Sequence, residues 1–198
     1  GITPPLASNE INAEVNLDAG STVGNMFTST VTVYDSLGNN IPVTLTFTNT
    51  GVNAWDVAGS VPASAGSGVT LNGAATIPVA FDASGQLTIP AANVTMAMTL
   101  TNGAASPQNV TWNLYDASGL NNNSLTGYAS PSSTTFLGQD GYPAGSLRGV
   151  SFDENGVGVT VKLNGPGRDR AVDPDQPHAL SDAQIYERNH LRHRHRLK

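Results

Sequence analysis

Cysteine is absent from the 198 residues of the chain, so neither disulfide bonds nor thiolate chemistry can contribute to its stability or activity. No apolar run approaches the roughly 20 residues of a membrane-spanning helix, and no signal-peptide pattern opens the chain. We therefore expect no insertion into a membrane. Long charged side chains are also scarce, whereas threonine, serine, asparagine and glycine are abundant, which is typical of an all-β protein with many turns.

Basic residues are nearly missing from most of the chain. Residues 1–167 contain two bases, Arg148 and Lys162, against ten acidic residues, a net charge of −8. Residues 168–198 contain seven bases, five acidic residues and all four histidines, and no glycine occurs after Gly167. The change of composition predicts a boundary near residue 165. A body with this negative charge is not expected to bind nucleic acid.

The central stretch, Met26–Phe47, predicts a β-hairpin. In both arms apolar residues alternate with threonine or another small or polar residue, the two-residue period of a strand with one buried face. The connecting residues suit a tight turn, because Asp35 can bond its own backbone and Gly38 and Asn39 tolerate a positive φ. Since Pro42 has no N–H group, we expect the start of the second arm to lie at an edge of the sheet.

Further short strands separated by glycine, asparagine and aspartate turns are predicted up to Leu163. In the first of them, residues 11–17, the odd-numbered residues are expected to be buried. Residues 58–68 are predicted as a surface loop and Asp116–Ser124 as irregular structure. The predicted strands outside the hairpin are 11–17, 54–57, 69–71, 76–81, 86–89, 93–101, 110–115, 134–137, 147–152 and 157–163. This spacing predicts an all-β fold, an antiparallel sandwich or barrel of short strands.

Three segments are expected along the chain. Residues 1–10 form an extended lead-in, because consecutive prolines hold φ near the polyproline value. Residues 11–165 form the β-domain. Residues 166–198 form a basic, histidine-rich tail that is poorly ordered or marginally helical. A capping box precedes residues 182–197, but the apolar residues there lie six apart and fall on different faces.

The β-domain resembles the outer domain of the bacterial flagellar hook protein. The resemblance is carried by segments that occur in the family's order and spacing: Val31–Asn39, Asn53–Trp55, Phe81–Gly85, Leu120 with Tyr128–Ser130, Gln139–Tyr142, and Gly145 to Gly156. It covers residues 1–165 approximately. The helical segments that pair into the tube core of hook proteins are not found. The amino-acid sequence after Gly165 also departs from the family, as it would after a shift of the reading frame or in an added extension.

The resemblance implies a structural subunit of the flagellar hook, the curved tube that joins basal body to filament and transmits torque. It implies no enzyme activity and no cofactor. The implied partners are other hook subunits and, during assembly, a hook cap protein. The implied location is extracellular, after export through the flagellar secretion apparatus. Without the terminal helices the chain is expected to be a truncated or fragment form and a monomer in isolation.

A functional alternative to a hook subunit is a binding module, an extracellular adhesin-like or carbohydrate-binding β-sandwich. Exposed aromatic residues such as Trp55, Tyr128 or Tyr142 could stack on a sugar. The interpretation we favour is that these aromatic side chains cover an edge of the core.

No catalytic, cofactor-binding or metal-binding residue is predicted. The oxygen-rich segments Asp153–Gly156 and Asp116–Asn123 lack the spacing of an EF-hand and are predicted as turns. Asp140 is likewise predicted as a turn residue rather than a general acid. Asn93, Asn109 and Asn122 begin N-glycosylation motifs, which arise by chance in such a composition. The tail residues that could bind metal or phosphate are predicted to be solvated: His190, Arg192, His193, Arg194, His195 and Arg196.

Overall fold

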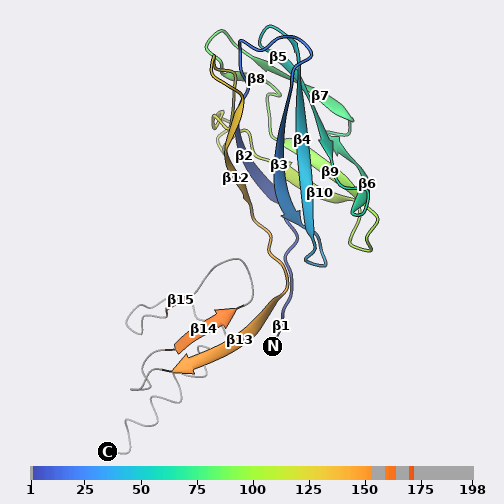
Figure 1. The fold of residues 1–198 in the computed structure, drawn as a ribbon, viewed down its shortest axis with the longest axis vertical. Helices are drawn as coiled ribbons and strands as arrows, with labels where there is room; N and C mark the ends of the chain where they lie inside the picture. Colours follow the sequence, from blue (N-terminus) through green and yellow to red (C-terminus); the bar gives the residue numbers. More distant parts are fainter. Residues whose placement is uncertain (1, 153–158, 164–169, 172–198) are drawn as a thin grey trace, which may run out of the picture. The chain divides into compact units, whose positions relative to one another are not determined.

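The computed structural model describes residues 2–152, 159–163 and 170–171 (Figure 1), and within them all regular structure is β-strand. The prediction of an all-β fold is therefore confirmed. The strands are β1 (Ile2–Thr3), β2 (Glu10–Asn16), β3 (Met26–Tyr34), β4 (Asn40–Gly51), β5 (Ala54–Ser60), β6 (Gly66–Leu71), β7 (Thr76–Phe81), β8 (Leu87–Ile89), β9 (Val94–Leu100), β10 (Gln108–Trp112), β11 (Leu125–Thr126), β12 (Ser133–Gln139), β13 (Gly145–Phe152), β14 (Val159–Leu163) and β15 (Arg170–Ala171). No helix long and apolar enough to cross a bilayer occurs among these residues.

The first sheet is antiparallel, with the strand order β3-β4-β5-β7-β8. The predicted hairpin forms β3 and β4, and its register pairs Val31 with Val43. Pro42 pairs with Thr32, but the pairing of β4 with β5 begins only at Thr44. Pro42 therefore has no strand on its other side and lies at an edge, as predicted from its missing N–H group.

The second sheet has the order β11-β2-β10-β9-β6, and β12 also pairs with β2. At one end of this sheet the pairs β10 with β9 and β9 with β6 are antiparallel. Two ladders depart from the predicted antiparallel pattern, because β2 runs parallel to both β10 and β11. Strand β2 thus pairs with segments about a hundred residues later in the chain. Local sequence patterns do not reveal such distant pairing.

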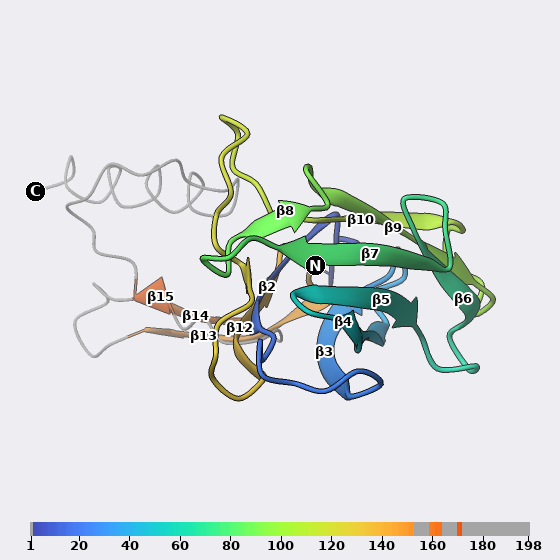
Figure 2. The ribbon, with the colours of Figure 1, turned by 90° about the horizontal axis from the view of Figure 1, so that it is seen from above.

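The inward residues of both sheets form one hydrophobic core. Figure 2 shows how the strands of the two sheets curl and lie over one another. Burial alternates along β2 and β9 as predicted, with Ile11, Val15, Met96 and Met98 at most 2% exposed. Trp112 is fully buried and meets Phe47 edge-on, with ring centroids 6.2 Å apart. This aromatic pair joins the two sheets across the core.

The prediction of a surface loop over residues 58–68 is wrong at both ends. Strand β5 continues to Ser60 and β6 begins at Gly66, so that only 61–65 connects them. A Cβ atom at Gly59 would come within 2.8 Å of Val69 Cγ1, and one at Gly66 would overlap the carbonyl oxygen of Thr99. These glycines allow close packing between strands, whereas in the sequence they indicate a loop.

The chain divides into two compact units, residues 1–147 with 163–167, and residues 148–162 with 168–198. The predicted lead-in contains a strand in the first unit, because Ile2 and Thr3 pair with the start of β13. In the second unit Thr160 of β14 pairs with Ala171 of β15. The predicted second hairpin corresponds to β13 and β14, which are neighbours in the sheet order β1-β13-β14-β15. The predicted turn 153–156 and tail helix 182–197 lie outside the described residues.

Candidate functional site

Three turns of the first unit share the pattern Asp-x-x-Gly and the same hydrogen bonds. Their glycines, Gly38, Gly85 and Gly119, have φ of 82°, 76° and 76°. In each turn the aspartate Oδ1 accepts hydrogen bonds from the backbone N–H groups two and four residues later. The glycine N–H donates to the aspartate carbonyl, which closes the turn. The predicted turns at Asp35, Asp82 and Asp116 are therefore present.

Asp35 differs from the other two aspartates in its burial. Its side chain is 0% exposed, whereas Asp82 and Asp116 are exposed. Its second oxygen, Oδ2, accepts hydrogen bonds from Asn39 Nδ2 at 2.9 Å and from Asn102 Nδ2 at 2.7 Å. Asn102 belongs to the connection between β9 and β10, so the carboxylate links the first sheet to the second.

Opposing effects act on the pKa of Asp35. Burial acts to raise the pKa, because the charged form loses hydration. Hydrogen bonds from the side chain and backbone of Asn39, from the Asn102 side chain and from the Leu37 backbone act the other way, and the pKa lies below its ordinary value. The carboxylate is thus held ionised. Its oxygens are engaged by protein donors, so it serves as a structural anion rather than as a general acid.

A network of polar groups holds the chain where it enters and leaves the first unit. The backbone N–H and carbonyl of Leu6 bond those of Tyr142, at 3.0 and 2.9 Å. Ser8 Oγ donates to Gln139 Oε1 at 2.5 Å and accepts from the N–H of Tyr34 at 2.9 Å. Gln108 Nε2 donates to the carbonyls of Ser8 and Tyr34, both at 2.9 Å. Segments more than a hundred residues apart in sequence are joined here.

Sequence reasoning did not single out Ser8 or Gln108, and it named Gln139 only as part of the family segment Gln139–Tyr142. One signal was available for Gln108, because it occupies an inward position of its strand, two residues before Val110 and four before Trp112. A polar residue at such a position is buried, here 8% exposed, and therefore needs partners.

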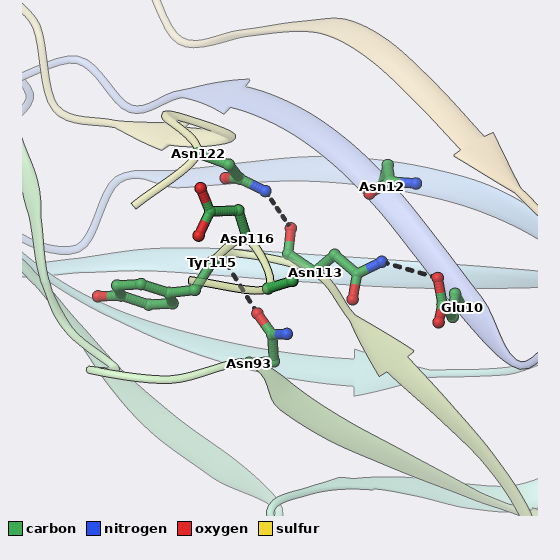
Figure 3. A pocket seen from close by; sticks show the side chains of 8 residues that line it. Glu10, Asn12, Asn93, Asn113, Tyr115, Asp116 and Asn122 are labelled. Carbon is green, nitrogen blue, oxygen red and sulfur yellow. Dashed lines mark hydrogen bonds between the residues drawn. The ribbon is translucent and has the colours of Figure 1, made fainter. Parts of the chain in front are cut away.

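A shallow polar cleft of about 410 Å³ lies over β2 and the turn after β10 (Figure 3). Its side chains bond one another: Asn113 Nδ2 donates to Glu10 Oε2 at 3.1 Å, and Asn93 Oδ1 accepts from the N–H of Tyr115 at 2.8 Å. Burial raises the pKa of Tyr115, whose hydroxyl donates to the carbonyl of Pro90 at 2.8 Å. The lining residues are Glu10, Asn12, Asn93, Asn113, Tyr115, Asp116, Ala117 and Asn122. This arrangement can hold water or a small polar molecule, and it presents no nucleophile beside a base.

The aromatic residues of the carbohydrate-binding alternative are not brought together. Trp55 is only 2% exposed and belongs to the core, so it cannot stack on a sugar. Tyr128 and Tyr142 are 44% and 42% exposed. The Tyr128 hydroxyl accepts a hydrogen bond from Gln86 Nε2 beside the Asp82 turn, whereas Tyr142 pairs with the lead-in. These positions form no common platform.

Asp140 caps the start of β2. Its Oδ1 accepts hydrogen bonds from the N–H groups of Asn9 and Glu10, at 2.8 and 3.0 Å. The glycosylation-motif residues Asn93, Asn109 and Asn122 are exposed, and Asn93 and Asn122 are engaged in hydrogen bonds. In the part of the chain that the structure describes, no group of three or more histidine, cysteine or acidic side chains could hold a metal ion. The tail histidines and Asp153–Gly156 lie outside that part.

The buried core, the repeated turns and the network at the chain entry define a structural β-domain, in which the engaged polar groups stabilise the fold. Comparison with known families specifies it further. The chain belongs to the family described as the flagellar basal body protein FlaE D2 domain, whose model matches residues 6–142. The resemblance to the flagellar hook protein is thereby confirmed, and the adhesin-like alternative is not favoured.

Individual hook proteins are similar over parts of their length. The flagellar hook protein FlgE of Rhizobium meliloti (strain 1021) is 35% identical over 79 residues, which are 40% of this chain and 18% of that protein. The Helicobacter pylori flagellar hook protein FlgE2 superposes with a TM-score of 0.44 at 17% identity, over 71% of this chain and 31% of its own. A 32 kDa fragment of FlgE from Caulobacter crescentus gives a TM-score of 0.38 at 22% identity, over 58% and 46% of the two chains. The chain thus spans less than half the length of each of these relatives.

Proposed function

We propose that the chain is a structural subunit of the bacterial flagellar hook, the curved tube that joins basal body to filament and transmits torque. The observation that carries the proposal is the family match over residues 6–142. A rigid two-sheet body with polar, chemically inert turns suits a load-bearing role, in which no bond is made or broken. Enzyme activity is therefore not part of the proposal.

The proposal includes partners and a location. Other hook subunits are the partners in the assembled tube, with a hook cap protein during assembly, and the isolated chain is a monomer. The subunit is extracellular after export through the flagellar secretion apparatus. The resemblance to hook proteins supports the hook partners and the location, and the low content of long charged side chains suits packing between copies.

The β-domain of this subunit is proposed to extend from residue 11 to 165, preceded by a lead-in and followed by a tail that does not belong to it. The change of composition near residue 165, after which no glycine beyond Gly167 occurs and bases become frequent, supports this limit.

The chain contains no cysteine, which provides a direct test of the proposed function. Thr99→Cys places one thiol at an exposed position of β9. In living cells of the source organism that carry this variant, a fluorescent maleimide is expected to label short structures between the cell body and the filament. The unsubstituted chain is the control and should remain unlabelled. Label along the filament, or only inside cells, would contradict the proposal.

A further inference from the structure

The stretch from Ala19 to Trp55 exposes no charge. Its single ionisable acid, Asp35, is fully buried, and it contains no base. This stretch includes β3 and β4, whose outward residues form a nearly uniform surface. We call this surface the hairpin face, and it consists of Met26, Thr28, Thr30, Thr32, Thr44, Thr46 and Thr48.

Cross-strand pairing orders the hairpin face. Thr28 lies opposite Thr46 and Thr30 opposite Thr44, and the hydroxyl oxygens of the second pair are 2.9 Å apart. Threonine is β-branched and stiff at χ1, so its burial under a partner loses less side-chain entropy than burial of a lysine or glutamate. The face is therefore suited to contact.

Apolar side chains lie at both ends of the hairpin. Val23, Met26 and Val52 are 70%, 66% and 92% exposed at one end, and Leu37 is 56% exposed in the turn at the other. The loop that carries Val23 is held against β4, because the N–H of Gly24 donates to the carbonyl of Asn49 at 2.8 Å. The backbone that carries Val23 is therefore held in place, and exposed apolar groups that lie together are typical of an interaction surface.

The outer face of the other sheet has a different character. Strand β2 presents the exposed carboxylates of Glu10 and Glu14 there. Large exposed hydrophobic residues are absent from β6, β9 and β10 but present on β12, where Phe136 and Leu137 are 50% and 40% exposed next to the acidic strand β2. On the first sheet, the acid nearest to the hairpin face is Asp56, a half-buried residue of β5 that pairs with Thr48.

Like charge restricts how two copies can meet. Residues 1–147 contain eight acidic residues and no lysine, arginine or histidine, so no cation of this part of a neighbouring copy can offset its carboxylates. A contact that brings carboxylates together costs free energy, because like charges oppose each other across an interface. The hairpin face and its apolar ends avoid this cost.

We propose that the hairpin face is the surface through which the chain contacts a second copy of itself during assembly. The inference rests on the proposed function and adds the place of the contact. It commits to a copy of the chain as the occupant, because the uncharged face allows association of two bodies that otherwise repel each other.

The test uses two variants of the cysteine-free chain. Thr30→Cys places a thiol in the hairpin face, and Thr99→Cys places a matched thiol at another exposed position, on the outer face of β9. Both are coupled to a maleimide-benzophenone in assembled hooks and irradiated. Several-fold more two-chain adduct is expected from Thr30→Cys than from Thr99→Cys. Equal yields, a higher yield from Thr99→Cys, or adducts of Thr30→Cys with another protein would overturn the inference.

A charge substitution provides a second test. Thr46→Asp is expected to reduce the number of hooks per cell several-fold, while Thr99→Asp leaves it unchanged, with thermal melting of both chains as the control for folding. Hooks formed normally by a folded Thr46→Asp chain would overturn the inference and leave the proposed function intact. Absence of fluorescent label from the hook with Thr99→Cys would overturn both.

Discussion

The aspartates of the three Asp-x-x-Gly turns make the same backbone hydrogen bonds, but their surroundings differ. Asp116 is exposed, so water can replace its carboxylate when the side chain is removed. Asp35 is buried and also receives two side-chain amides, Asn39 Nδ2 and Asn102 Nδ2, which would lose their acceptor. A buried donor without a partner keeps the full cost of its desolvation.

Asp35→Ala is therefore expected to lower the free energy of unfolding by about 1–3 kcal/mol, the range for buried groups left unsatisfied. The matched variant Asp116→Ala is expected to lower it less, because only exposed bonds of the same turn are lost. Urea denaturation of both variants measures the difference. Equal losses would show that burial of Asp35 adds nothing to its role.

The lowered pKa of Asp35 predicts the pH dependence of stability. The folded state favours the ionised carboxylate, so the unfolded state binds more protons as the pH falls. The stabilisation is complete above the ordinary pKa of 3.8 and is lost as the pH falls through the lower folded value. In Asp35→Asn this contribution is absent, because an amide replaces the titrating group. Chemical denaturation across this pH range should show a smaller acid loss for the variant, and parallel curves would contradict the assignment.

Strand β6 shows how pairing within the second sheet depends on a small residue. A Cβ atom at Gly66 would overlap the carbonyl oxygen of Thr99 on β9, whereas one at Gly68 would meet nothing within 4 Å. Both glycines lie in the same strand, and neither has a positive φ. They differ chiefly in the space that is available for a side chain.

Gly66→Ala is expected to destabilise the domain by about 1–3 kcal/mol, the usual cost of forcing extra atoms into a packed site. Gly68→Ala is expected to be neutral or slightly stabilising, because alanine restricts the unfolded chain. Thermal unfolding followed by circular dichroism measures both. A neutral Gly66→Ala would mean that β6 and β9 can separate without cost.

The elements that were predicted correctly are those whose signal is local. The hairpin of β3 and β4 is encoded by alternation and by the Asp35–Gly38 turn, all within one stretch of chain. The parallel pairing of β2 was not predicted, because no local pattern of residues 10–16 specifies partners that are distant in sequence. The same holds for Gly66, whose role is set by Thr99, and for Gln108, whose partners are two distant carbonyls. The resemblance to hook proteins was recognised from short motifs, and two of these contain turns of the fold, Asp35–Gly38 and Asp82–Gly85.

Residues 1–147 form a body with eight carboxylates and no basic side chain. Their mutual repulsion has no internal cation to offset it, and only dissolved salt screens it. Raising the ionic strength from about 10 mM to about 150 mM shortens the Debye length from about 30 to about 8 Å. The melting temperature is therefore expected to rise with sodium chloride. The double variant Glu10→Gln, Glu14→Gln should show a smaller rise, and an unchanged or falling melting temperature would contradict this account.

The scarcity of bases also makes trypsin a sharp probe of the domain limit. Before residue 168 it can cut only after Arg148 and Lys162. If the β-domain extends to residue 165, pairing of β13 and β14 protects both sites, and brief digestion should first give a fragment that ends at Arg168. Intact mass spectrometry identifies the product. A first product that ends at Arg148 would place the limit at the boundary between the two compact units.

The partners of β2 also determine when the protein can fold. Ser8, just before this strand, bonds a residue 131 positions later, and β2 itself pairs with β10, β11 and β12. Loop closure over such separations is slow, and folding rates fall as contacts become less local. An emerging chain therefore cannot complete the domain until residue 139 has been delivered. Until then β2 lacks β12, the last of its three partners to emerge, and the Ser8–Gln139 hydrogen bond cannot form.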